Sequence, residues 1–213
     1  MKVTIVYDNE VYLEGLKADW GLSCLIEAEG IPRILFDTGA KGSILLHNME
    51  QLNIDPLSID EVFISHAHWD HMGGLADFLK INNRVKIYMP LSAAKGATHA
   101  NTIGVGAPMQ LHENVYSTGE LQGIEQSLVI STLQGLVVIV GCSHPGVDKI
   151  LKAASGWGNV YAIIGGLHGF HDFGLFKGLG RVCPCHCTQF KREIEKLFTN
   201  MYNSGGAGRV ILL

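Results

Sequence analysis

Two short apolar segments of the chain run directly into histidine-bearing loops. Val62–Ser65 leads into His66, a glycine pair and a helical pattern, and Val138–Gly141 leads into Cys142-Ser143-His144, Pro145-Gly146 and a second helical pattern. Polar residues that follow the carboxyl end of a strand are typical of the sites of α/β proteins. The repeated pattern therefore predicts an α/β fold with candidate site residues at the ends of these two strands.

The rest of the chain alternates between strand-like and helix-like segments. Apolar runs predict strands at Lys2–Tyr7, Leu22–Ala28, Arg33–Phe36, Glu61–Ser65, Val85–Met89, Ser127–Leu133, Leu136–Gly141, Val160–Ile164 and Arg209–Leu213. Helical spacing predicts helices at Ser43–Leu52, Gly73–Lys80, Val147–Ala154 and Glu193–Phe198. No linker, charge block or low-complexity segment divides the chain. Residues 1–213 are therefore predicted to form a single domain of two layered sheets.

Composition excludes several classes of protein. Hydrophobic residues make up 47% and charged residues 17%, which excludes disorder. A net charge of −4 offers no basic footprint for nucleic acid, and no apolar run is long enough to cross a membrane. The five cysteines, an odd number, do not resemble a secreted disulfide framework. We expect a cytoplasmic protein that acts on a small molecule, without nucleic acid or membrane; its oligomeric state stays open.

The run from His66 to His71 carries the clearest chemical signal. His66, His68, Asp70 and His71 are four metal-capable groups within six residues. In an extended loop the first three project to one side, because side chains alternate with period two, and His71 points differently. Such a run predicts two adjacent ions, and imidazole with carboxylate suits zinc, iron or manganese. The alternative is a polar loop whose histidines are solvated.

This run resembles the signature of the metallo-β-lactamase fold superfamily. Asp37-Thr38-Gly39 at a strand end and His144 after a later strand fall in the order expected for that superfamily. A closer resemblance is to its branch of dihydropterin ribofuranosyl-aminobenzene phosphate synthase-like hydrolases. That resemblance is carried by Tyr7-Asp8-Asn9, Trp20-Gly21-Leu22-Ser23, Gly141-Cys142-Ser143-His144-Pro145-Gly146, Gly165-Gly166-Leu167-His168 and His186-Cys187-Thr188. It implies a four-layer αβ/βα sandwich of two mixed β-sheets flanked by helices.

The resemblance also implies ligands for two divalent ions, zinc first, with manganese or iron as alternatives. His66, His68 and His144 would hold one ion, and Asp70, His71 and His186 the other. Most members bridge the two ions with an Asp, and here His168 is the candidate for that position. Because a neutral imidazole cannot bridge two ions as a carboxylate does, His168 would bind one ion or contact substrate. Asp70 would also orient the attacking water. Asp37 would accept a hydrogen bond from a ligand imidazole, or else serve only as a turn residue.

The expected activity is metal-dependent hydrolysis of an ester, lactone or phosphodiester by a metal-activated water. One alternative is the condensation of a dihydropterin with a ribofuranosyl-aminobenzene phosphate. That reaction needs a basic cluster for the phosphate, and the chain offers only the scattered Lys41, Lys95 and Lys177, which argues against it. Two others are an iron-dependent redox enzyme and a non-enzymatic metal-binding module.

The remaining histidines and cysteines are assigned structural roles. His47, His99, His112 and His171 are not expected to be ligands, although His99 and His112 could contact substrate from Ser92–His112, a predicted flap. Cys183, Cys185 and Cys187 would share one face of an extended segment, opposite His186. They are expected to pack as small buried residues, as Cys142 would beside His144, with a metal or redox role for these thiols as the alternative.

Overall fold

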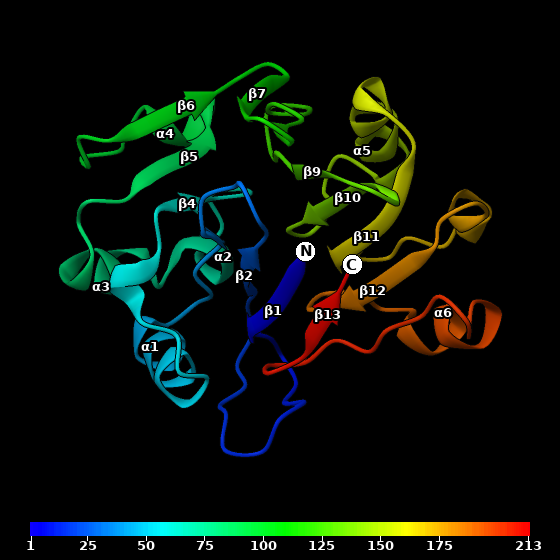
Figure 1. The fold of residues 1–213 in the computed structure, drawn as a ribbon, viewed down its shortest axis with the longest axis horizontal. Coiled ribbons are helices and arrows are strands. Elements are labelled where there is room, and N and C mark those ends of the chain that lie inside the picture. The colour runs from blue at the N-terminus through cyan, green and yellow to red at the C-terminus, as the bar shows by residue number, and fades with distance from the viewer.

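The computed structural model describes all 213 residues and contains two mixed β-sheets that pack face to face (Figure 1). The first sheet has the strand order β13 (Val210–Leu212), β1 (Lys2–Tyr7), β2 (Ser23–Glu27), β3 (Ile34–Phe36), β4 (Glu61–Phe63), β5 (Lys86–Pro90) and β6 (Thr102–Val105). The second has the order β12 (Arg181–Cys185), β11 (Val160–Gly166), β10 (Gly135–Val140), β9 (Leu128–Thr132), β8 (Val115–Ser117) and β7 (Met109–His112).

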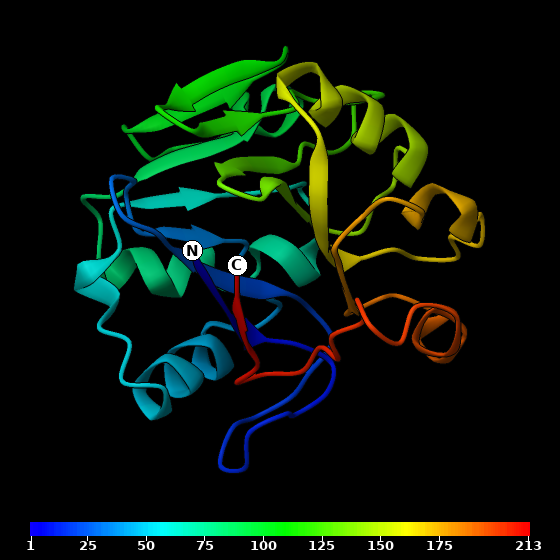
Figure 2. The ribbon, with the colours of Figure 1, turned by 45° about the vertical axis from the view of Figure 1, so that its right-hand side comes forward.

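Helices cover the outer faces of both sheets, giving four layers (Figure 1, Figure 2). The α-helices are α1 (Gly42–Gln51), α2 (Trp69–Met72), α3 (Leu75–Ile81), α4 (Leu91–Ala94), α5 (Val147–Ala154) and α6 (Lys191–Leu197). Short 3₁₀ turns lie at Pro56–Ser58, Ser155–Trp157 and Phe173–Phe176. Helices α1 and α3 pack on the first sheet, whereas α5 and α6 pack on the second.

Alternation of side chains along the strands builds the layers. On β10, Val137 and Ile139 face the core between the sheets, while Val138 and Val140 face the core under α5. Successive side chains of a strand point to opposite faces, so a continuous apolar strand can be buried on both faces. This explains why β10, with five consecutive buried residues, lies in the interior of its sheet.

Parallel pairing brings the candidate site residues together. Strands β3, β4 and β5 are parallel, as are β10, β11 and β12. The carboxyl ends of parallel neighbours lie at the same edge of a sheet, so the loops that follow β3 and β4 are adjacent, as are those that follow β10, β11 and β12. Backbone hydrogen bonds fix this arrangement, including one of 2.8 Å from Asp37 N to Phe63 O.

The predicted α/β sandwich of two mixed sheets flanked by helices is confirmed, with most element boundaries within two residues. The prediction that Ser92–His112 forms a flap is wrong. Its residues form α4, β6 and β7, and β6 pairs with β5 in the first sheet. The glycine-rich sequence obscured β6, because glycine disfavours strands; here Gly104 and Gly106 lie against Leu91.

The two termini are adjacent in the first sheet, where β1 pairs with β13, and the Met1 amino group donates a 2.7 Å hydrogen bond to Leu213 O. None of the helices is long and apolar enough to cross a bilayer.

Leu128 and Leu133 test the core between the sheets. Leu128 is fully buried on β9, whereas Leu133, just beyond the same strand, is fully exposed. Leu128→Ala should lower the free energy of unfolding by about 2–5 kcal/mol, because it leaves a cavity. Leu133→Ala should change it by less than about 0.5 kcal/mol. Urea denaturation measures both, and equal effects would contradict the assignment of this core.

Candidate metal centre

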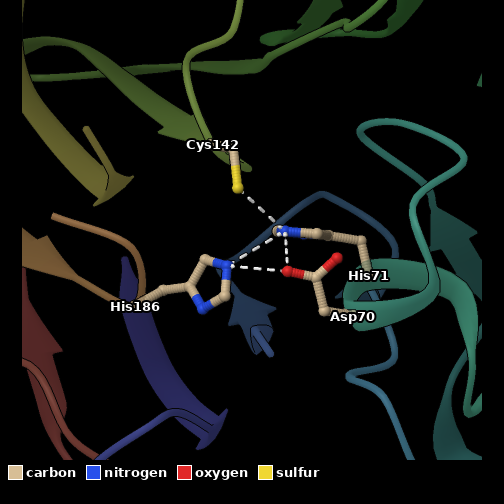
Figure 3. Close-up of side chains that lie close together, drawn as sticks. All are labelled: Asp70, His71, Cys142 and His186. Carbon is tan, nitrogen blue, oxygen red and sulfur yellow. Dashed lines mark hydrogen bonds and ion pairs between the residues drawn. The ribbon is translucent and has the colours of Figure 1, made fainter. Parts of the chain in front are cut away.

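A buried group of four side chains lies where the two sheets meet (Figure 3). Asp70 and His71 come from α2, His186 follows β12, and Cys142 follows β10. His71 Nε2 is 3.2 Å from His186 Nε2 and 3.6 Å from Asp70 Oδ2. The same Asp70 oxygen is 3.3 Å from His186 Nε2, and Cys142 Sγ is 3.1 Å from His71 Nε2.

A second group lies next to the first and is more open to solvent. His66 Nε2 and His144 Nε2 lie 3.0 and 3.2 Å from His68 Nδ1. His66 is buried, His144 is half-buried and His68 is exposed. The rings of His66 and His71 are 4.1 Å apart between centroids, so the two groups are in contact. The structure thus brings together the two ligand triads expected from the sequence.

These separations fit metal ligands. Ligands bonded to a tetrahedral ion at about 2.0–2.3 Å lie about 3.3–3.7 Å from one another. Four pairs of ligand atoms in the four-residue group are 3.1–3.6 Å apart, and all of its ligand atoms lie within 4.8 Å of one another. Imidazole, carboxylate and thiol are also donors that zinc, manganese or iron accept. The residues present therefore fit a divalent ion.

Hydrogen-bond partners at Nδ1 of three imidazole rings leave the lone pair of the other ring nitrogen, Nε2, directed into the two ligand groups. Asp37 Oδ2 accepts a 2.7 Å hydrogen bond from His71 Nδ1, and Asn9 Oδ1 accepts a 2.9 Å bond from His186 Nδ1. Ser65 Oγ donates to Asp37 Oδ2 and lies 2.9 Å from His66 Nδ1, from which it can accept. With the proton on Nδ1, the Nε2 atom of each ring is free to bind a cation.

Burial favours the neutral form of four imidazoles in and beside the two groups. It is the main cause that lowers the pKa of His66, His71 and His168, and it lowers the pKa of His144 to about 4. Neighbouring imidazoles add to the effect on all of them. For Asp70, burial acts to raise the pKa, but the hydrogen bond with His186 and nearby His71 outweigh it and leave the pKa lowered. The groups therefore offer neutral nitrogens and an ionised carboxylate, the forms that bind metal.

Asp37 is completely buried and connects the strand ends. It accepts hydrogen bonds from Ser65 N (2.7 Å) and Ser65 Oγ (2.7 Å) in addition to the one from His71. Burial raises its pKa well above the usual value, and the bonds from Ser65 oppose that shift. The expected hydrogen bond from an imidazole to Asp37 is therefore present, and His71 is its donor.

Sequence reasoning missed Glu125, which is fully buried beneath the loop after β10. Its Oε1 accepts hydrogen bonds from the backbone N–H groups of Gly141, Cys142 and Ser143, and its Oε2 accepts one from His144 N. Burial raises its pKa to about 7 despite these bonds. Glu125 thereby fixes the backbone that carries Cys142 and His144. It stands in no motif, so no local signal pointed to it.

Two N-terminal segments that carried the resemblance also have defined positions. Asp8 is buried and accepts hydrogen bonds from the backbone of Asn9, His186 and Gly206. Trp20 Nε1 donates a 3.0 Å bond to Asp70 Oδ2, and its ring meets the His186 ring edge-on. These contacts hold His186 and Asp70 in place from the segment that connects β1 and β2.

His168 lies beside the second triad rather than within it, with its ring centroid 4.6 Å from that of His144. It groups with Cys142 and Cys187, and its Nδ1 is 2.8 Å from Cys187 Sγ. Two glycines just before it allow the close packing here: a Cβ on Gly166 would lie 2.5 Å from Gly141 O and 2.6 Å from Cys187 Sγ. The structure therefore favours His168 as a residue beside the triads rather than as a bridge between them.

Two expectations about side-chain direction are wrong. Helix α2 begins at Trp69, so the extended alternation stops at His68, and Asp70 lies with His71 in one group. Cys183 and Cys185 are buried in the core between the sheets as expected, but Cys187 faces the site. The cause is His186, whose φ of 48° reverses the chain direction after β12.

The histidines left out of the site lie elsewhere. His112 Nε2 is 2.9 Å from both oxygens of Glu61, which begins β4, the end of that strand opposite His66. His99 contacts Asn83 O, ahead of β5. Both therefore lie away from the triads, which argues against the alternative of a substrate contact. His47 and His171 each contact a backbone carbonyl, and both contacts are exposed to solvent.

Comparison with known proteins agrees with this geometry. The family model of the metallo-β-lactamase superfamily matches residues 21–142, more than half of the chain. The chain belongs to the metallo-β-lactamase superfamily.

Individual relatives extend the match over nearly the whole chain. It is 31% identical to 7,8-dihydropterin-6-methyl-4-(β-D-ribofuranosyl)-aminobenzene-5′-phosphate synthase of Methanocaldococcus jannaschii, across 98% of this chain and 95% of the relative. Among solved structures, Tm1679, a metal-dependent hydrolase of the β-lactamase superfamily, superposes with a TM-score of 0.81 at 25% identity, covering 100% and 99% of the two chains. YhfI of Bacillus subtilis has the same fold, with a TM-score of 0.68 at 16% identity and coverage of 99% and 98%.

Asp37→Asn tests the network behind the imidazoles. The amide NH₂ cannot accept from both Ser65 Oγ and His71 Nδ1, so His71 would favour a proton on Nε2. Affinity for zinc should fall about 10–100-fold while the protein stays folded. Competition with a chromogenic chelator measures this, with Asp148→Asn on the exposed face of α5 as the control. Equal zinc affinity in the two variants would contradict the role of Asp37.

The raised pKa of Glu125 predicts a dependence of stability on pH. Because the folded-state pKa of about 7 exceeds the ordinary pKa of 4.5, the folded protein binds more protons between these limits. The stabilisation is therefore full below about 4.5 and is lost as the pH rises through 7, by about 3 kcal/mol in all.

Comparison of metal-free wild type with Glu125→Gln isolates this effect. The free energy of unfolding of wild type relative to the variant should decline from pH 4.5 to pH 8, as measured by urea denaturation. A difference that is constant across this range would show that Glu125 titrates normally.

Proposed function

We propose that the protein is a metal-dependent hydrolase that acts on an ester, lactone or phosphodiester of a small molecule. The observation that carries the proposal is the pair of contacting ligand groups, one formed by His66, His68 and His144 and the other including Asp70, His71 and His186. We propose zinc for both ions, with manganese or iron as alternatives that the same donors accept.

The two groups differ in access, which fits a catalytic rather than a purely structural centre. Structural metal sites are closed, whereas catalytic sites keep an open position. The four-residue group around Asp70 is buried, but His68 is exposed and the neighbouring Trp69 is 62% exposed. A substrate would therefore approach from the side of His68 and His144.

Divalent ions held there would provide a water nucleophile near neutral pH and stabilise charge on the reacting oxygens. The residues of the chain position that chemistry. Asp70, held through its Oδ2 by Trp20 Nε1, would orient the attacking water and accept its proton. Asp37 and Asn9 hold the rings of His71 and His186 with Nε2 facing inward.

A second candidate function is the condensing reaction named for the Methanocaldococcus relative. A cavity of about 590 Å³ shares His186 and Cys187 with the site and is lined by Lys191 and Arg192. Together with the 31% identity to the relative, these two cations favour a phosphate-bearing substrate. The scattered lysines of the sequence did not indicate such a basic cluster. Two facts weigh against the condensing reaction. Lys191 is already paired with Glu10. The alignment with the relative is 278 positions long, whereas this chain has 213 residues, so this chain lacks segments that the relative has.

Asp70→Asn tests the hydrolase proposal. On metal-loaded protein, the kcat/KM for the best substrate of a panel of aryl esters, lactones and phosphodiesters should fall about 10²–10⁴-fold. Asp148→Asn, on exposed α5, should retain wild-type activity. Chelation should abolish turnover and added metal should restore it.

Further assays on the same metal-loaded protein distinguish the alternative functions. Formation of a joined product from a dihydropterin and a ribofuranosyl-aminobenzene phosphate, followed by mass spectrometry, would establish the second candidate in place of hydrolysis. Iron content with a visible colour would favour a redox enzyme. Metal binding without turnover of either kind would leave a metal-binding module.

A further inference from the structure

Cys142 occupies a shared position among the metal-capable side chains. It belongs to the group of Asp70, His71 and His186, to the group of His66 and His144, and to the group of His168 and Cys187, whereas every other member belongs to one group only. In each group all the ligand atoms lie within 4.8 Å of one another. Its sulfur is therefore close to the ligand atoms of Asp70, His71 and His186, beside which Figure 3 shows it, and also to those of His66 and His144.

The charge of the buried group indicates a role for this sulfur. Asp70 is the only carboxylate in any of the three groups, and an imidazole that binds a metal does so in its neutral form. A divalent ion bound by Asp70 and two neutral histidines would keep a net charge of +1 in a buried site, and an uncompensated buried charge is costly. One thiolate at the position of Cys142 would bring that charge to zero.

The backbone around Cys142 is fixed so that its side chain stays in this place. Cys142 N donates a 3.0 Å hydrogen bond to Glu125 Oε1, and the next residue, Ser143, has a φ of 60°. Ser143 Oγ in turn donates to Gly166 O at 2.7 Å. A non-glycine residue in the left-handed region stores strain that the surroundings must hold, a common feature of functional sites.

We propose that Cys142 is a metal ligand whose thiolate completes the tetrahedral set of Asp70, His71 and His186 and faces the neighbouring ion held by His66 and His144. This rests on the proposed metal-dependent function. The thiol proton leaves to solvent as the sulfur–metal bond forms, as it does for coordinating thiols in general. The sulfur supplies the second anionic ligand of the centre. The neutral imidazole of His168, which the sequence interpretation placed at the position of the bridging Asp, cannot supply that charge.

Cobalt substitution tests the proposal directly. Under reducing conditions, apoprotein loaded with Co²⁺ should show a near-ultraviolet thiolate-to-cobalt charge-transfer band. Cys142→Ser should lose this band, and affinity for the more weakly bound ion should fall by at least about 10–100-fold. Cys142→Asp, which restores an anionic oxygen ligand, should recover ion binding without the band. Bound cobalt is counted by equilibrium dialysis.

Cys187→Ser is the matched control, because Cys187 is the other thiol at the site. It should keep the band. Cys24, Cys183 and Cys185 are buried in the core between the sheets, so a band that persists in Cys187→Ser is assigned to Cys142 even if Cys142→Ser fails to fold.

The outcomes separate this inference from the proposed function. Wild-type protein that binds no cobalt would overturn both. Cobalt binding without a thiolate band, a band that survives Cys142→Ser, or a band lost in Cys187→Ser would overturn the role of Cys142 and leave the metal-dependent function standing.

Discussion

The buried carboxylate of Asp37 connects the fold to the candidate metal centre. The parallel pairing of β3 with β4 places Asp37 beside Ser65, and the carboxylate accepts from both the backbone and the hydroxyl of that residue. Through His71 it determines which ring nitrogen faces inward, and through Ser65 it reaches His66. Burial alone disfavours the charged form of Asp37. The hydrogen bonds from Ser65 oppose that effect, and a cation bound at the imidazoles would favour the charged form further.

Left-handed residues at the strand ends shape the rest of the centre. Asp37, Ser143, His168 and His186 follow β3, β10, β11 and β12, and each has a φ between 45° and 60°. This conformation costs free energy for residues with a Cβ, and it turns the chain sharply at the end of a strand. The turns direct side chains from four strands into one space where the sheets meet. The strain is thus the structural cost of gathering ligands from distant parts of the sequence.

The sequence was sufficient to predict the layers and the members of the two triads, because the signals for both are local in the chain. Short apolar strands such as Val137–Val140 are buried on both faces, so their pattern is local and strong. The ligands from His66 to His71 are dense enough to stand out. The orientation of Cys187 was not predictable, because it depends on the φ of His186 rather than on alternation. Neither was the role of Glu125, which is defined by backbone groups far along the chain.

The central claim is that two contacting ligand groups each hold a divalent ion. The most direct measurement is the number of metal ions per chain, by plasma mass spectrometry, on protein purified without chelators or a histidine tag. The structure predicts two equivalents, one for His66, His68 and His144 and one for the buried group of Asp70, His71 and His186. A chain that binds no metal, even after reconstitution with zinc, manganese or iron, would contradict the account.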